Sequence, residues 1–157
     1  MYPSRMDPTN PVVKLCVEGM EAEANGNNVQ AHALFLNAWK HSTDDFERCI
    51  AAHYVARHTT CPADSLHWNQ KALDHAARVE FDKVSELYAS LHLNVGKSHE
   101  DLGNLQTAKR HYGMAFDALT RVPSGGYREI VQDGIERALN RVNGSVEPCV
   151  KLITIKQ

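Results

Sequence analysis

The chain has 157 residues and a mass of 17.5 kDa, a length that fits one domain with a sizeable core. Hydrophobic residues make up 43% and charged residues 23%, and no apolar run approaches the roughly 20 residues of a membrane-spanning helix. The net charge of −2 is unlike the basic composition of nucleic-acid-binding proteins, so we expect neither a nucleic acid nor a membrane as partner. No secretory signal is visible, so we expect a cytoplasmic protein with reduced thiols at Cys16, Cys49, Cys61 and Cys149.

The first predicted element is a helical hairpin over residues 12–45, after a lead-in at residues 1–10. It carries small residues in the pattern Gly-x6-Gly-x4-Ala-x6-Ala and an aromatic residue four positions after the first alanine: Gly19, Gly26, Ala31, Ala38 and Phe35. We expect Gly26 to end the first helix in a backbone conformation that other residues disfavour. Gly19 should let the second helix approach closely, and Phe35 should fill the space between successive hairpins.

The same spacing recurs in a second unit at residues 46–79 and in a third at residues 89–122. Shifting the small-residue positions of the first unit by 34 residues gives His53, Thr60, Ser65 and Ala72. A further shift of 43 residues gives Gly96, Gly103, Ala108 and Ala115. Tyr112 holds the aromatic position of the third unit. The second unit has Asn69 there, with Trp68 beside it as a candidate substitute. Because a lone hairpin cannot bury its apolar face, we expect the three units to stack.

A last helix is predicted over residues 127–143, after the break at residues 123–126. Its apolar stripe consists of Tyr127, Ile130, Val131, Ile135, Leu139 and Val142. We expect this helix to cap the open face of the third hairpin. The tail at residues 144–157 is rich in β-branched residues, and two alternatives stay open for it: disorder, or an extended segment laid on a surface.

The spacing resembles the tetratricopeptide repeat (TPR) family over about residues 11–120, and the third unit matches most closely at Leu93–Lys97, Leu102–Asn104, Ala108, Tyr112 and Ala115. The resemblance implies an all-α, right-handed solenoid of three helical hairpins with a capping helix and an extended tail. The nine extra residues around 79–83 resemble the longer repeats of bacterial regulatory proteins, in which the second helix overruns. A non-catalytic protein-interaction module is the function that this resemblance implies.

In this family the first helix of each hairpin lines a concave groove. Carried onto this chain, the groove takes in Val13, Cys16, Val17, Met20, Glu23, Glu47, Ile50, Ala51, Tyr54, Arg57, His58, Ser90, Leu93, Asn94, Lys97, Glu100 and Asp101. The lysine and asparagine that clamp acidic chaperone tails are absent, because Cys16 and Met20 stand at those positions. We single out Met20, Glu23, Tyr54, Arg57, His58, Asn94, Lys97, Glu100 and Asp101 as partner-binding residues. The expected partner is a protein or peptide with an apolar segment and an acidic group, which Arg57 would hold.

Two other classes of function stay open. The chain could self-associate as a homodimer through the helix at residues 127–142 or through the tail. It could also be a small metal-binding or enzymatic protein, for which the candidates are Cys49, His53, His58 and Cys61, or the pair His92 and His99. In the competing interpretation, Cys49 and His53 lie on a different side of the helix end from His58 and Cys61, so the four cannot surround one ion. The same interpretation packs His92 and His99 against the preceding hairpin. We therefore expect no catalytic residues, no metal and no cofactor.

Overall fold

The structure, a computed structural model, describes residues 7–144, and within that range the chain is helical with no β-strand. The elements in chain order are α1 (Pro11–Ala24), α2 (Asn28–His41), α3 (Asp45–Ala56), α4 (Pro62–Ala76), α5 (Phe81–Val84), α6 (Tyr88–Asp101), α7 (Leu105–Ala118), the 3₁₀ helix η1 (Leu119–Arg121) and α8 (Gly126–Gly144). The all-α prediction is confirmed for this range. The predictions for the tail, Cys149 included, lie outside the described residues.

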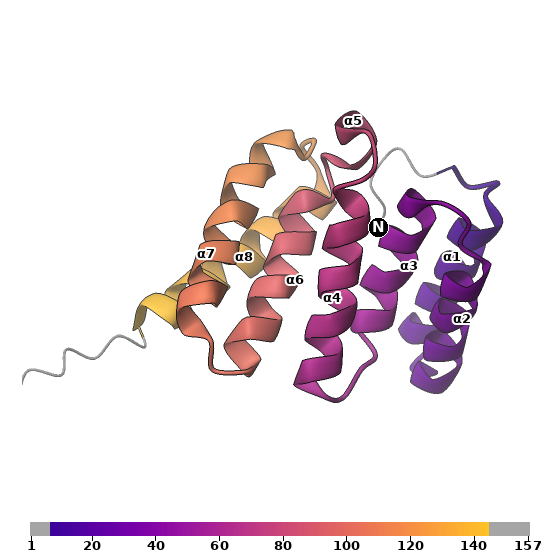
Figure 1. Cartoon of the computed structure of the whole chain (residues 1–157), viewed down its shortest axis with the longest axis horizontal. Coiled ribbons are helices and arrows are strands. Elements are labelled where there is room, and N and C mark those ends of the chain that lie inside the picture. The colour runs from indigo at the N-terminus through magenta and orange to yellow at the C-terminus, as the bar shows by residue number, and fades with distance from the viewer. Residues whose placement is uncertain (1–6, 145–157) are drawn as a thin grey trace, which may run out of the picture.

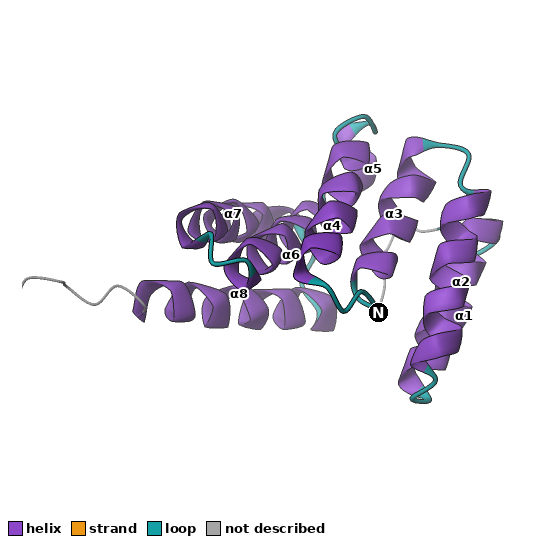
Figure 2. Cartoon of the chain, turned by 60° about the horizontal axis from the view of Figure 1, so that its bottom comes forward, coloured by secondary structure: helices purple, strands orange, loops and turns teal. Residues whose placement is uncertain are grey.

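Six of the described helices form three consecutive pairs, α1/α2, α3/α4 and α6/α7, which lie side by side across the molecule (Figure 1). Neighbouring pairs pack through α2 against α3 and through α4 against α6, and α1 also contacts α3. The last helix, α8, lies against both α6 and α7 (Figure 2). The described chain is therefore a row of helix pairs closed at one end by a single helix.

Local sequence explains where several of these helices begin. Asn10, Asn27 and Asp44 each accept a hydrogen bond from a backbone N–H in the first turn of the helix that follows, and so satisfy groups that have no partner inside the helix. Pro11 and Pro62 stand in the first turns of α1 and α4, where a missing N–H costs nothing.

Two glycines end the first helices of the outer pairs in the conformation that their spacing predicts. Gly26 follows α1 with a φ of 77°, and Gly103 follows α6 with a φ of 78°. In this left-handed region a side chain would clash with the backbone, so glycine is favoured. Both glycines therefore turn the chain back into the second helix of the pair.

A glycine also faces an aromatic ring inside each outer pair. A Cβ atom at position 19 would overlap the ring of Phe35, and one at position 96 would lie 2.6 Å from Cε1 of Tyr112. Both rings are fully buried. Phe35 stacks on Tyr54 of the next pair at 5.2 Å between ring centroids, and Tyr112 packs against the apolar residues of α8. Each ring thus fills the space between its own pair and the next element.

The middle pair lacks such a ring. Asn69 is buried at the aromatic position, and its Nδ2 donates to Oγ of Ser98 on α6 at 2.9 Å. Trp68 does not substitute for the missing ring, because it packs in the other direction, edge-on against Trp39 of α2 at 5.1 Å. Space between the second and third pairs is therefore bordered by polar side chains.

The extra residues before the third pair do not extend α4, which ends at Ala76. They form a turn and the short helix α5 instead, so the expected overrun of the second helix is wrong. Val84 of α5 is fully buried, whereas Phe81 is 52% exposed. The insertion is thus anchored to the core through Val84, with Val79 packed beside it.

The apolar face of α8 differs from the predicted stripe at one position. Val131, Ile135 and Val142 are buried as expected, but Ile130 is 65% exposed, and Ala138 takes part in the buried face. The stripe on a straight helix is narrower than the predicted set, and Ile130 lies at its edge. None of the described helices is both long enough and apolar enough to cross a membrane.

Candidate functional site

A cavity of about 210 Å³ opens among the first helices of the three pairs and the start of α8. We call it the apolar cavity after its Met20, Ile50, Leu87 and Leu91 side chains, beside which polar residues also line it. Its lining comes from α1, α3, α6, α8 and the residue before α6, and comprises Met20, Glu23, Cys49, Ile50, His53, Tyr54, Arg57, Leu87, Ser90, Leu91 and Tyr127. It unites residues that are up to 107 positions apart in the chain, from Met20 to Tyr127.

Helix α3 supplies the largest share of this lining. Ile50, His53 and Arg57 follow one another at spacings of three and four residues, which place them on one face of the helix. The same spacing brings Met20 and Glu23 together on α1. Regular helix geometry is thus enough to collect these side chains around one cavity.

The two reactive groups in the cavity wall are not activated. Burial raises the pKa of the Cys49 thiol to about 12, so the thiol stays protonated at neutral pH. Burial, and to a lesser extent the charge of Arg57, lowers the pKa of His53 to about 4, so its imidazole is neutral. A catalytic cysteine needs the opposite shift, toward the thiolate.

The polar edge of the apolar cavity is an ion pair. Nη2 of Arg57 donates to Oε1 of Glu23 at 2.7 Å, and the side chains are 43% and 27% exposed, respectively. The Arg57 guanidinium also lies 5.8 Å from the ring centroid of Tyr54. A fixed cation therefore stands beside an apolar wall and remains accessible to solvent.

Tyr127 borders the cavity on the α8 side. Its hydroxyl donates to Oγ of Ser90 at 2.9 Å, and Ser90 in turn donates to the carbonyl oxygen of Leu87 at 3.0 Å. This chain of hydrogen bonds ties the start of α8 to the start of α6. The capping helix thus supplies one side of the site as well as covering the third pair.

A second, polar hollow lies on the far side of Arg57, between the end of α3, α4 and α6. It is lined by Ala56, Arg57, Thr59, Ser65, Asn69, Asn94, Lys97, Ser98 and Asp101. Nδ2 of Asn94 lies 3.3 Å from Nδ1 of His53 in the apolar cavity, and Ser98 donates to the Asn94 carbonyl at 3.0 Å. The two hollows thus adjoin at the interface where the second pair has no aromatic ring.

The structure brings seven of the nine predicted partner-binding residues to these two hollows. Met20, Glu23 and Tyr54 line the first, Asn94, Lys97 and Asp101 line the second, and Arg57 lines both. Lys97 and Asp101 form an ion pair with each other.

His58 and Glu100 line neither hollow. The His58 side chain is 8% exposed and packs on Phe35 with 5.3 Å between ring centroids, and its Nε2 lies 3.5 Å from Oε1 of Glu23 at the edge of the apolar cavity. Glu100 accepts hydrogen bonds from Arg141 at 2.8 and 3.0 Å and another from the Tyr112 hydroxyl. These contacts hold the pKa of Glu100 at about 2 and direct its carboxylate toward α8.

Several other inward positions carried over from the resembling family are covered by neighbouring helices. Cys16 and Ala51 are fully buried, and Val13 is 3% exposed. Glu47 is buried as well, and its carboxylate accepts from Asn10 and from the backbone and hydroxyl of Thr43. These residues hold α1 and α3 together and do not form a binding surface.

The Cys/His candidates for a metal do not converge. Cys61 is exposed at the start of α4, Cys49 is buried in the cavity wall, and His58 packs on Phe35. Among residues 7–144, no group of three His, Cys, Asp or Glu side chains has a geometry that could hold a metal ion.

His92 and His99 occupy a different environment from the expected one. They face His111 of α7 in their own pair: Nδ1 of His92 lies 3.1 Å from Nδ1 of His111, and the rings of His99 and His111 are 5.8 Å apart between centroids. The expectation that this face packs against the preceding hairpin is therefore wrong for both side chains, which meet α7 of their own pair. Nδ1 of His99 is buried without a hydrogen-bond partner among the described residues.

Sequence reasoning missed the cavity residues Leu87, Leu91 and Tyr127. Leu87 and Leu91 are four positions apart at the start of α6, a spacing that signals a common face. Tyr127 belongs to the predicted buried stripe of α8, and nothing in its local sequence indicates that it reaches α6.

Comparison of the chain with protein-family models, curated proteins and solved structures finds no match in any of the three.

Proposed function

We propose that this chain is a non-catalytic interaction module in which three TPR-like hairpins form a solenoid, and that the apolar cavity receives one apolar side chain of a partner peptide or helix. The observation that carries the proposal is the apolar cavity itself, with a solvent-accessible arginine at its edge. The repeated glycine and aromatic packing of the outer pairs supports the TPR-like assignment.

The size of the cavity favours a side-chain anchor over a small-molecule ligand. Pockets for drug-sized molecules span roughly 300–1,000 Å³, and this one has about 210 Å³. Met20 suits such an anchor, because a flexible thioether adapts to different apolar partners, and Tyr54, stacked on Phe35, supplies a fixed ring beside it. The raised pKa of Cys49 and the lowered pKa of His53 support a non-catalytic site.

Arg57 supplies the preference for an acidic ligand. Its guanidinium already binds the Glu23 carboxylate, so a carboxylate of the partner competes with Glu23 for the same donors. The proposal therefore makes two predictions of opposite sign at neighbouring positions. Arg57→Gln should weaken binding about tenfold or more, and Glu23→Gln should strengthen it, since the internal competitor is removed.

The test starts from selection of peptides from a random phage-displayed library on the purified protein, followed by calorimetry with the selected peptides. We expect an apolar residue near an acidic residue in the selected sequences. Met20→Trp, which fills the cavity, should abolish binding, and Lys109→Gln on α7 is the matched control. Equal affinity of the selected peptides for wild type and for Met20→Trp would rule out the cavity as the binding site.

Self-association through α8 is a second candidate, favoured by one observation. Ile130 is 65% exposed on a helix whose other branched apolar residues are buried or partly buried. If α8 forms a dimer interface, light scattering should show a dimer that Ile130→Lys converts to a monomer. A monomer at all concentrations in the wild type would exclude this candidate.

A further inference from the structure

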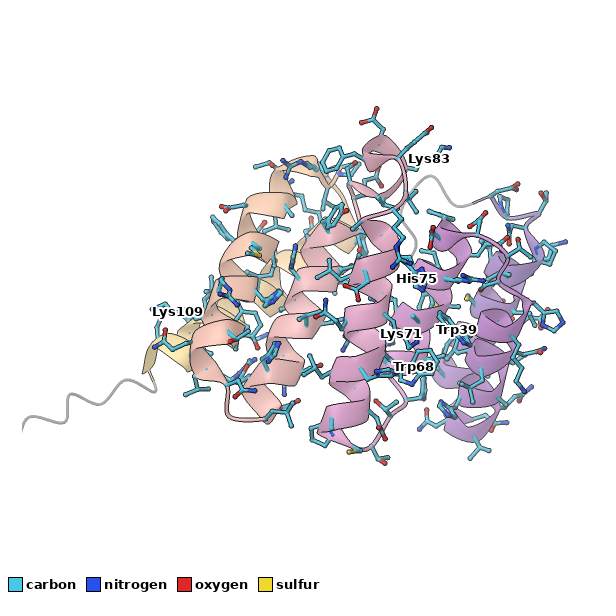
Figure 3. The ribbon with its side chains drawn as sticks, in the orientation of Figure 1. Trp39, Trp68, Lys71, His75, Lys83 and Lys109 are labelled. Carbon is cyan, nitrogen blue, oxygen red and sulfur yellow. The ribbon has the colours of Figure 1, made fainter. Side chains whose placement is uncertain are left out.

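A third hollow, of about 400 Å³, lies where α4 faces α2 and shares no lining residue with the apolar cavity. We call it the tryptophan hollow, and it is lined by Trp39, Lys40, Ser42, Arg48, Lys71 and His75. Figure 3 shows Trp39, Trp68, Lys71 and His75 gathered between these two helices. The lining contains three permanent cations and no carboxylate.

None of the three permanent cations of the tryptophan hollow forms a close ion pair with an acid of residues 7–144. Among residues 7–144, no carboxylate oxygen lies within 4.0 Å of the charged nitrogens of Lys40, Arg48 or Lys71. Asp45, whose pKa is lowered mainly by its hydrogen bond with His75 and also by the charge of Arg48, pairs more closely with other groups, at 2.6 Å from Nδ1 of the lining residue His75 and 3.7 Å from Nη1 of Arg78. Positive charge therefore accumulates here in a chain whose overall net charge is −2.

Two indole rings hold one of these cations in position. Nζ of Lys71 lies 5.3 Å from the ring centroid of Trp39 and 5.8 Å from that of Trp68. The rings meet edge to face, with 5.1 Å between centroids and an interplanar angle of 86°. Cation–π attraction of this kind orders a side chain that would otherwise move freely.

We propose that the tryptophan hollow binds the phosphate or carboxylate group of an anionic ligand, with Lys40, Arg48 and Lys71 as its cationic contacts. Holding three like charges around one hollow costs free energy, and a bound oxyanion offsets that cost. The planar fork of Arg48 matches two oxygens of either group, while the lysines act as point charges beside it. This site is independent of the proposed function of the apolar cavity.

The chain offers a direct readout of binding, because Trp39 and Trp68 are its only tryptophans. Trp39 lines the hollow and Trp68 packs edge-on against Trp39, so tryptophan fluorescence reports on this region. We would titrate the full chain at low ionic strength with inorganic phosphate and, in a separate arm, with succinate. Sodium chloride at matched ionic strength controls for screening. A saturable change with either oxyanion is expected, and the arm that responds identifies a phosphate or a carboxylate as the recognised group.

The variant Lys40→Gln/Arg48→Gln removes two contacts without altering either indole. It should raise the dissociation constant at least tenfold, whereas Lys109→Gln, far away on α7 (Figure 3), should leave it unchanged. Calorimetric unfolding gives a second readout, since a bound oxyanion should raise the midpoint of wild type and not of the double variant. The proposal is overturned if neither oxyanion gives a saturable change, if sodium chloride reproduces the change, or if the double variant responds like wild type.

Discussion

Gly19 and Gly96 decide how closely the two helices of the outer pairs approach each other. In both places the partner is an aromatic ring that is fully buried, so the ring cannot move away from an added side chain. The Tyr112 ring is further fixed by its hydroxyl, which donates to Glu100. Tight packing against a fixed neighbour makes these positions sensitive to a single methyl group.

Gly96→Ala should lower the free energy of unfolding by about 1–3 kcal/mol, because the new methyl group would lie 2.6 Å from Cε1 of Tyr112 and 3.3 Å from the Ala108 carbonyl oxygen. Gly113→Ala is the matched control. Gly113 is in the interior of α7 with nothing within 4 Å of its would-be Cβ, so alanine there should raise stability by up to about 1 kcal/mol. Urea denaturation measures both changes. Equal effects of the same sign would contradict the packing argument.

The histidines at the α6/α7 interface make stability depend on pH. Burial is the main cause that lowers the pKa of His111 to about 4, and the charges of His92, His99 and Arg110 lower it further. Burial also lowers the pKa of His92. Between pH 6.5 and 4 the unfolded chain therefore binds protons that the folded chain does not bind, so stability is lost as the pH falls through this range.

We expect the protein to unfold at lower urea concentration at about pH 5 than at about pH 7, and His111→Gln to reduce the difference by an amount on the order of 1 kcal/mol. His67→Gln is the control, because His67 is exposed on α4. If the free energy of unfolding depends on pH equally in His111→Gln and in wild type, the histidine contacts do not cause that dependence.

At the scale of elements, α8 is held to the third pair by an ion pair as well as by apolar burial. Arg141 donates two hydrogen bonds to Glu100, which also accepts from Tyr112, so one carboxylate joins α6, α7 and α8. Because Arg141 lowers the pKa of Glu100 to about 2, this contribution is complete above about pH 4.5 and is lost toward pH 2. The charged junction lies at the opposite end of α8 from Tyr127.

Arg141→Gln should increase hydrogen exchange of the last two turns of α8, with a loss of about 1 kcal/mol because the Arg141 side chain is 47% exposed. Arg137→Gln serves as the control on the same helix. Its pair with Asp133, at 2.6 Å, is exposed on both sides and joins no other element. Similar exchange in the two variants would mean that the Glu100 junction does not hold α8.

The second pair explains which parts of the site were predictable. Its departures from the repeat, His53 and Asn69, are visible in the sequence. Whether they leave a hollow depends on which neighbouring pair the Trp68 side chain packs against. Trp68 packs on Trp39 of the first pair, so the interface with the third pair keeps its polar residues and its two hollows. Periodicity assigns a residue to a face of a helix and does not decide between two neighbouring faces that both offer apolar contacts.

Over the whole described chain, the order of the helices and their turns follow from local signals. Gly26 and Gly103 have the required φ values, and the apolar stripes predict the paired helices. The sequence was less informative about positions that depend on the rotation of one helix against another. His92, Glu100 and Ile130 each differ from expectation in the neighbours that their side chains meet.

Protonation of all nine histidines would change the net charge of the chain from −2 to +7. The structure limits this change, because the pKa values of His53, His58, His92 and His111 are all lowered, mainly by burial. Mild acidification therefore adds less positive charge at these four histidines than it would at free imidazoles. Solubility should change less with pH than the composition alone predicts.

The most direct test of the central claim, that the apolar cavity receives a partner's side chain, is a methyl NMR titration of the methionine-labelled chain with the tightest selected peptide. Met20 lines the cavity, whereas Met114 is 42% exposed on α7 and serves as the internal reference. We predict that the Met20 methyl signal shifts to saturation while the Met114 signal stays in place. Saturated peptide binding that leaves the Met20 signal unmoved would contradict the account.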